Sequence, residues 1–343
     1  MPLPAPALPF PPPPSGKTGW PWDTHTPLPP PQPGDADLPT LTLVTPSYNQ
    51  GQFIEETIRS VLLQGYPHLE YIVMDGGSHD ATVEILKKYA PWLAHWQSAK
   101  DGGQTAAINQ GFARATGELR GWQNSDDYFL PDALLAAGRA ARAHPEIDAF
   151  YGPVDYVDAE GKFLRHAAIR EPSFAHIMPY PCVLNQALLI RRPLFERGLR
   201  LDENITHCMD YDLLWQLLFL KARFAAVPDF RAEFRQHDDA KGVYQLEICY
   251  QEFFDYYLRL LRDKRLPASI HPALIGELRA SCLNDFGTGH FANCRAKFRQ
   301  ALHAVGPAFL TPELLGKYAA SALPPGWVSR MKRLLRPKRK GSS

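Results

Sequence analysis

The sequence predicts an α/β protein with a doubly wound, mostly parallel sheet, a helical C-terminal extension and a disordered Pro-rich N-terminus. Three observations in the 343 residues support this prediction. Between residues 40 and 130, short apolar runs alternate with amphipathic helical patterns, as is typical of a parallel sheet with helices on both faces. From residue 243 onward the patterns are helical. Fifteen of the 33 prolines lie in residues 1–39, where their fixed φ angles favour an extended chain.

Three parts of the chain follow from these patterns. Residues 1–39 form the Pro-rich tail, residues 40–242 the α/β domain, and residues 243–343 a helical extension with a basic C-terminal tail. Hydrophobic residues make up 45% and charged residues 21% of the chain, which is enough apolar material for a packed core.

Charge and cysteine content limit the class of protein. The formal net charge of +1 gives no argument for a nucleic-acid partner. The five cysteines form no CxxC pair and are expected to be reduced thiols of a cytosolic protein. Because no apolar run approaches the length of a membrane span and the N-terminus lacks a basic signal region, we expect a cytoplasmic location.

The individual elements of the α/β domain can be assigned in order. Four strands are expected in "LTLVT", "YIVMD", residues 93–97 and "ELRGWQN". Three helices are expected in "FIEETIRSVLLQG", "DATVEILKKYA" and "TAAINQGFARATG". Beyond residue 150 we expect two strands joined by a turn at 159–161, a strand leading into a helix in "NQALLIRRPLF", and an apolar helix in "DYDLLWQLLFLKA".

Polar groups follow three of the predicted strands. Residues 45–49 follow the first, residues 75–78 the second and residues 124–127 the fourth. Ligands of doubly wound sheets bind beyond the carboxyl ends of the strands, so these groups predict a site at one sheet edge. The first strand is not followed by GxGxxG or GxxxxGK[ST], which disfavours a dinucleotide redox fold and a P-loop.

The segment "GWQNSDDYF" ends a strand on two adjacent carboxylates, Asp126 and Asp127. Like charges side by side repel and need compensation. A divalent cation would compensate them, because hard cations prefer carboxylate oxygens. Alternatively, one carboxylate caps the helix that Pro131 opens. These nine residues alone leave both interpretations open.

Several segments together resemble a known family. "TPSYNQGQFIEETIRSVLLQGYPHLEYIVMDGGSHDAT", "DGGQTAAINQGFARATGELRGWQNSDD" and "MDYDLLWQL" are similar, in order and spacing, to family 2 glycosyltransferases of the GT-A fold. The resemblance covers residues 40–241. It implies an inverting enzyme that uses a nucleotide-sugar donor and a divalent metal.

The resemblance assigns the nucleotide to the first two strand ends. It implies that Thr45, Pro46 and Tyr48 border the base. It implies that Asp75 binds the base or ribose, and that Asp101 lies along the nucleotide sugar. The alternative for Asp75 is a turn residue before two glycines.

The resemblance assigns metal and diphosphate to two further segments. Asn124 to Asp126 occupies the place of the family's DxD motif, with Asn at its first acidic position. Asp126 would be the principal ligand of Mn2+ or Mg2+, and Asp127 would face metal or sugar. In "FRQHDDAKG", His237 would complete the metal shell or contact the diphosphate, and Lys241 would offset phosphate charge. A structural role is the alternative for His237.

The segment "MDYDLLW" matches the family's catalytic segment. The resemblance implies that Asp210 is the general base, and we expect Asp212 to cap the helix or support the base. Helix capping is also the alternative for Asp210, because carboxylates are stabilised at helix N-termini. The family usually has an acid where this chain has Met209, so the local charge is lower here.

The predicted reaction is transfer of a sugar from a nucleotide sugar, with UDP expected by analogy, to a hydroxyl of a glycan or lipid-linked acceptor. Polysaccharide or glycan assembly is the expected context. The alternatives are a sugar nucleotidyltransferase and a non-catalytic nucleotide-sugar binder. The C-terminal "GWVSRMKRLLRPKRKGSS" is either a peripheral membrane contact or a solvated basic tail.

Overall fold

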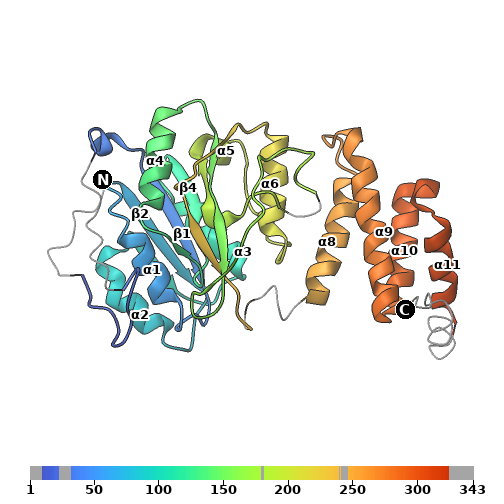
Figure 1. Ribbon diagram of the computed structural model, residues 1–343, viewed down its shortest axis with the longest axis horizontal. Coiled ribbons are helices and arrows are strands. Elements are labelled where there is room, and N and C mark those ends of the chain that lie inside the picture. Colours follow the sequence, from blue (N-terminus) through green and yellow to red (C-terminus); the bar gives the residue numbers. More distant parts are fainter. Residues whose placement is uncertain (1–9, 23–31, 179–180, 239, 241–245, 324–343) are drawn as a thin grey trace, which may run out of the picture. The chain divides into compact units, whose positions relative to one another are not determined.

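A computed structural model describes residues 10–22, 32–178, 181–238, 240 and 246–323. The chain divides into two compact units, residues 1–245 and residues 246–343. The first unit holds the sheets and the second is helical (Figure 1).

Strands and helices alternate along the first unit. The strands are β1 (Leu41–Ser47), β2 (Leu69–Asp75), β3 (His95–Ser98), β4 (Leu119–Trp122), β5 (Tyr128–Phe129), β6 (Ala149–Tyr151), β7 (Val154–Val157), β8 (Phe163–His166), β9 (Leu188–Arg191), β10 (Phe224–Ala226) and β11 (Ala232–Arg235). The helices are α1 (Ile54–Leu62), α2 (Thr82–Tyr89), α3 (Gln104–Arg114), α4 (Ala133–Ala143), α5 (Arg192–Glu196) and α6 (Met209–Phe219).

The larger sheet confirms the predicted doubly wound arrangement. Its seven strands lie in the order β10-β6-β9-β4-β1-β2-β3. β1 pairs in parallel with β2 and β4, and β2 in parallel with β3, whereas β9 is antiparallel to β4 and β6. The carboxyl ends of β1, β2 and β4 therefore meet at one edge, as the sequence predicted.

Alternating residues of β1 pack against different layers of helices. Leu41 and Leu43 are buried in one core together with residues of α1, α2 and α4. Val44 faces α3, because a Cβ added to Gly111 of that helix would lie 2.4 Å from Val44 Cγ1. The sheet is thus covered on both faces, and only its edges remain for a ligand.

A smaller sheet has the strand order β5-β11-β7-β8. β11 pairs in parallel with β7 and antiparallel with β5. The two-residue strand β5 begins directly after Asp127, so this sheet holds the acidic turn from its C-terminal side. The turn-linked pair β7 and β8 was predicted, whereas β5, β10 and β11 were not.

Part of the Pro-rich N-terminus, residues 10–22 and 32–38, is packed on the first unit. Trp22 and Leu38 are buried, and the Trp20 indole donates to Phe129 O at 2.7 Å. A second anchor is the pair between Asp35 and Arg139 of α4, with Arg139 NH2 2.8 Å from Asp35 Oδ2. The remaining N-terminal residues lie outside the described part of the chain.

The second unit consists of helices, as predicted. They are α8 (Leu246–Leu260), α9 (His271–Thr288), α10 (Phe291–Val305) and α11 (Pro312–Ser321). Within the described residues, no helix combines the length and apolar character needed to cross a membrane. The basic C-terminal segment proposed to contact a membrane lies outside the described residues.

Candidate active site

The turns after β1 and β2 form one bonded unit. Ser47 and Asp75 are partners in the parallel register, and Gly76 N donates to Ser47 O at 2.9 Å. Asn49 Oδ1 accepts from His79 N at 2.9 Å. Tyr48 lies at this turn with 58% of its surface exposed. The turn thus presents an aromatic ring at the carboxyl edge of the sheet.

Thr45 and Pro46 lie inside the turn rather than on its surface. Both are buried, and the Thr45 hydroxyl is 2.9 Å from the Tyr71 hydroxyl. Of the three residues that the resemblance places beside the base, only Tyr48 is therefore exposed. Thr45 and Pro46 shape the turn that carries it.

The Asp75 carboxylate is buried and bonded within its own loop. Its Oδ2 accepts from Gly77 N at 3.1 Å, from Ser78 N at 2.9 Å and from Ser98 Oγ at 2.6 Å. Its Oδ1 accepts from Ser78 Oγ. These contacts support the alternative interpretation, in which Asp75 fixes the turn.

Asp101 lies beside this loop, at the start of α3. Its Oδ1 accepts from Gly103 N at 2.8 Å. A Cβ added to Gly76 would lie 3.2 Å from the same oxygen. The loop after β2 and the loop before α3 are thus in close contact, which brings Asp75 and Asp101 into one site.

The first turn of α3 joins two predicted parts of the site. Gln104 Nε2 donates to Asn124 Oδ1 at 3.1 Å. The adjacent Thr105 Oγ1 donates to Ile205 O at 2.8 Å and lies 3.0 Å from Met209 Sδ. The acidic turn after β4 and the start of α6 are therefore both held by two neighbouring residues of one helix.

Asp126 and His237 are brought together although 111 positions separate them. His237 Nε2 lies 3.1 Å from Asp126 Oδ2. The Asp126 side chain keeps 19% of its surface exposed, whereas His237 keeps 4%. The imidazole packs on the Phe53 ring at 4.6 Å between centroids, and its Nδ1 is buried without a hydrogen-bond partner. The exposed carboxylate is thus held by a buried ring.

This pair fits part of a divalent metal site. Neighbouring ligands of an octahedral ion with bonds of about 2.1 Å lie about 3 Å apart, which is close to the observed separation. Within the described residues, no group of three or more His, Cys, Asp and Glu side chains is placed to hold an ion. A bound ion would therefore need oxygens from a ligand or water.

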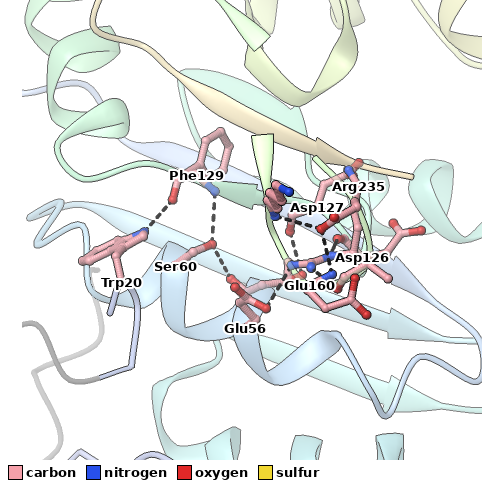
Figure 2. Close-up of polar contacts among 12 residues, drawn as sticks. Trp20, Glu56, Ser60, Asp126, Asp127, Phe129, Glu160 and Arg235 are labelled. Carbon is pink, nitrogen blue, oxygen red and sulfur yellow. Dashed lines mark hydrogen bonds and ion pairs between the residues drawn. The ribbon is translucent and has the colours of Figure 1, made fainter. Parts of the chain in front are cut away.

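Asp127 points into the protein, unlike Asp126 (Figure 2). Its Oδ2 accepts from Asn124 Nδ2 at 2.9 Å and from Gln186 Nε2 at 2.8 Å, and its Oδ1 accepts from Arg235 N at 2.9 Å. Burial and the Asp126 charge raise the pKa of Asp127 well above its ordinary value. We therefore interpret Asp127 as a positioning residue rather than as a group that faces metal or sugar.

Arg235 is a site residue that sequence reasoning missed. It is 2% exposed and donates to Asp126 O at 2.9 Å, to Ala159 O at 2.6 Å and to Glu56 Oε2 at 2.9 Å (Figure 2). Its guanidinium also lies 4.9 Å from the Phe53 ring centre. One buried cation thus holds the acidic turn, the β7–β8 turn and α1 together.

The contact of Asn124 with Asp127 gives a physical reason for an amide, rather than a carboxylate, at the first position of the DxD motif. Replacing Asn124 by Asp would put a carboxylate against a buried carboxylate whose pKa is already raised. The pair would hold a proton more tightly when folded than when unfolded, so its stability should fall as pH rises. We expect Asn124→Asp to lower stability by about 1–3 kcal/mol near pH 8 and by less near pH 5, in thermal unfolding.

Asn124→Ala is the matched control, because it removes the amide donor without adding a charge. Its loss of stability should also grow with pH, because the amide hydrogen bond that it loses lowers the pKa of Asp127, but it should grow less than that of Asn124→Asp. An Asn124→Asp variant as stable as wild type at pH 8 would contradict this explanation of the departure.

Asp210 and Asp212 differ in their surroundings at the start of α6. Asp212 is buried and accepts from Gln216 Nε2 at 2.6 Å. Asp210 is half-buried, and its Oδ1 lies 2.8 Å from Tyr211 N. Of the two, Asp210 is the more accessible to a substrate.

Lys241, which the resemblance places near the diphosphate, lies outside the described residues.

Comparison with known proteins places this geometry in a family. The family model described as "Glycosyl transferase family 2" matches residues 42–211. This segment belongs to glycosyl transferase family 2. It contains the turns after β1, β2 and β4 and ends within the first turn of α6, so all but the His237 segment of the candidate site falls inside it.

Curated relatives match part of the chain. An uncharacterized glycosyltransferase of Mycobacterium tuberculosis is 38% identical over 116 residues, covering 33% of this chain and 44% of the relative. The putative teichuronic acid biosynthesis glycosyltransferase TuaG of Bacillus subtilis is 35% identical over 99 residues, covering 28% of this chain and 39% of TuaG. The chain thus spans less than half the length of these two relatives.

Solved structures share the fold over most of the chain. The structure of S. aureus TarS 1-349 superposes with a TM-score of 0.63 at 18% identity, covering 88% of this chain and 93% of that one. The mannosyltransferase PcManGT of Pyrobaculum calidifontis, in complex with GDP-Man and Mn2+, gives a TM-score of 0.53 at 20% identity, covering 87% and 88%.

Proposed function

We propose that the protein is an inverting glycosyltransferase that moves a sugar from a nucleotide sugar, UDP-linked by preference, to an acceptor hydroxyl. The observation that carries the proposal is the partly exposed turn at the carboxyl edge, where Asp126 meets His237 at the same edge of the sheet as Asp101 and the turn of Tyr48. A polysaccharide, glycan or lipid-linked acceptor agrees with the names of relatives such as TuaG and the O-antigen biosynthesis protein RfbC of Myxococcus xanthus.

The donor would lie along the joined turns. Tyr48 would border the base, and the loop fixed by Asp75 would border the ribose. Asp101 would lie along the nucleotide sugar. Support comes from TarS, whose fold is shared and whose structures include complexes with UDP-GlcNAc and with UDP. PcManGT binds GDP-Man, so both nucleotides belong in any test.

Asp126 and His237 would hold Mn2+ or Mg2+ together with the diphosphate of the donor. When bound, such an ion stabilises negative charge on the departing diphosphate. The protein contributes the position of the two ligands: Arg235 holds the backbone of Asp126, and Phe53 supports the imidazole. Asp127, Asn124 and Gln186 would keep the turn in place from the interior.

Asp210 would act as the general base. A half-buried carboxylate at the start of a helix can accept a proton, and the helix N-terminus favours its ionised form. Asp210 would take the proton of the acceptor hydroxyl as that oxygen attacks the anomeric carbon on the face opposite the nucleotide. The result is a product of inverted configuration. Asp212 would support the helix through Gln216.

A donor screen tests the proposal. The protein is incubated with UDP- and GDP-sugars, with Mn2+ or with EDTA, and the products are measured by mass spectrometry. We expect metal-dependent release of UDP from one sugar donor. Binding of a nucleotide sugar without release would favour the non-catalytic binder. Formation of a nucleotide sugar from a nucleoside triphosphate and a sugar phosphate would favour the nucleotidyltransferase.

Arg235→Lys is expected to weaken metal-dependent nucleotide binding about 10- to 100-fold, as losses of groups that orient metal ligands commonly do. Lysine keeps the charge beside Glu56 but cannot also reach the carbonyls of Asp126 and Ala159 with fixed donors. Titration calorimetry with UDP and Mn2+ measures the change.

Arg231→Lys is the matched control. Arg231 precedes the same strand and pairs with Asp155 at 3.0 Å, but its side chain is 46% exposed. Exposed ion pairs contribute little, so this variant should bind as wild type does. An equal loss of metal-dependent UDP affinity in both variants would show that Arg235 has no special role in holding the acidic turn.

A further inference from the structure

We infer that Trp20, in the segment of residues 10–22, is a positioning residue: it holds the strand β5, which follows the acidic turn. The inference rests on the proposed function where it concerns metal and nucleotide. The part that concerns the strand stands without it. We call residues 10–22 the N-terminal strap.

The strap is fixed to α1 by one buried arginine. Arg59 is 4% exposed and donates to Pro11 O at 2.8 Å, to Pro21 O at 3.1 Å and to Trp22 O at 3.1 Å. Prolines have carbonyl acceptors but no backbone N–H, so a Pro-rich segment offers unpaired carbonyls along its length. A guanidinium with five donors can satisfy several of them at once.

Aromatic contacts complete the attachment. The Arg59 guanidinium lies 5.0 Å from the Phe10 ring centre and 5.6 Å from that of Trp22. Phe10 also packs on Tyr89 and Trp92, at 5.6 Å and 5.5 Å between ring centroids. The strap is therefore held at both of its ends, and it is not a loosely placed tail.

Trp20 bonds the strand that follows the acidic turn. Its Nε1 donates to Phe129 O at 2.7 Å, and Ser60 Oγ accepts from Phe129 N at 3.2 Å (Figure 2). β5 is the terminal strand of the smaller sheet and pairs with β11 on one side only. An edge strand leaves backbone groups without strand partners. Trp20 and Ser60 satisfy these groups for Phe129, which lies three residues after Asp126.

Lys17 of the strap also adds a positive charge that acts on Glu56, the ion-pair partner of Arg235. Burial raises the pKa of Glu56, and the charges of Arg235 and Lys17 oppose the rise. Glu56 is the partner of Arg235, which holds Asp126 O. Lys17 of the strap thus favours the ionised Glu56 that the arginine needs. The direct contact of the strap with the strand after the acidic turn is the Trp20 bond to Phe129, and the Lys17 charge adds to it.

The test compares Trp20→Phe with Trp22→Phe in the full chain. Trp20→Phe keeps an aromatic ring but removes the donor to Phe129. Trp22→Phe keeps both features that its residue supplies to Arg59, a ring and a backbone carbonyl. Three quantities are measured: hydrogen exchange of the amides of residues 126–130, the affinity for UDP as a function of Mn2+ concentration, and the melting temperature.

We expect Trp20→Phe to speed exchange at Phe129 roughly 5- to 30-fold, the change that the loss of one buried hydrogen bond brings to a local opening equilibrium. Its apparent Mn2+ affinity should fall about tenfold, at the low end for groups that support metal ligands. Trp22→Phe should match wild type in both.

Two results would contradict the inference, and a third would separate it from the proposed function. Unchanged exchange and unchanged Mn2+ dependence in Trp20→Phe would show that the strap does not position β5. A lower melting temperature with wild-type Mn2+ affinity, measured where the variant is fully folded, would make it a purely stabilising element. If wild type itself shows no metal-dependent binding, the proposed function fails, and the exchange at Phe129 alone decides whether Trp20 positions the strand.

Discussion

Asp210→Asn is expected to lower turnover by about two to four orders of magnitude, the usual contribution of a general base. Asparagine keeps the size of the side chain and part of its helix-capping ability, but it has no carboxylate to accept the proton. Donor binding should change little, because Asp210 is proposed to face the acceptor. Turnover, UDP affinity and melting temperature of the variant are the measurements.

Asp212→Asn is the control for Asp210. Asp212 is buried and bonded to Gln216, so its loss should follow stability rather than chemistry. Greater damage in Asp212→Asn, with Asp210→Asn within a few-fold of wild type, would move the base to Asp212. Wild-type turnover in both variants would place the base outside α6.

Asp126→Ala is expected to abolish the metal dependence of nucleotide binding while the fold remains intact. The Asp126 side chain is partly exposed, and its charge is one cause of the raised pKa of Asp127. Removing that charge relieves a repulsion but also removes the bond to the buried His237 ring, so the melting temperature should change little. UDP binding with and without Mn2+, together with thermal unfolding, tests both expectations.

Asp148→Ala is a matched control for Asp126→Ala. Asp148 also lies next to a strand of the larger sheet, but at the amino end of β6, where it pairs with Arg223 at 3.0 Å. It should leave nucleotide binding unchanged. Retained Mn2+ dependence in Asp126→Ala would show that the metal site lies elsewhere.

Much of the fold was predictable because its larger sheet is built from local signals. The runs "LTLVT" and "YIVMD" are apolar and β-branched, and the helices that follow them have regular apolar faces. The alternation of strands and helices then predicts parallel order. The carboxyl ends of β1, β2 and β4 then had to meet. That is why the turns of Tyr48, Asp75 and Asp126 could be assigned to one site.

The smaller sheet and its contacts were not predictable in the same way. β5 has two residues, which is too few to show a period, and β11 has four. Arg235 meets Asp126 across 109 positions, and Trp20 meets Phe129 across the same separation. The only local signal was the alternation in "RAEFRQH", which places Glu233, Arg235 and His237 on one face of a strand.

The Pro-rich N-terminus shows where composition misleads. Proline content argues for an extended chain, and residues 10–22 lack regular helix or strand. Extended chain is nevertheless compatible with order when its carbonyls find donors. Arg59 of α1 supplies these donors. The composition of residues 1–39 cannot predict a partner that lies outside this segment.

The central claim is that the Asp126–His237 pair binds a nucleotide diphosphate together with a divalent metal. Titration calorimetry of the full chain with UDP-GlcNAc and with GDP-Man, each with Mn2+ and with EDTA, tests it most directly. We expect one of the two to bind with Mn2+, to lose at least tenfold in affinity in EDTA, and to lose its Mn2+ dependence in Asp126→Ala. Equal affinity with Mn2+ and with EDTA, or no binding of either nucleotide sugar, would contradict the account.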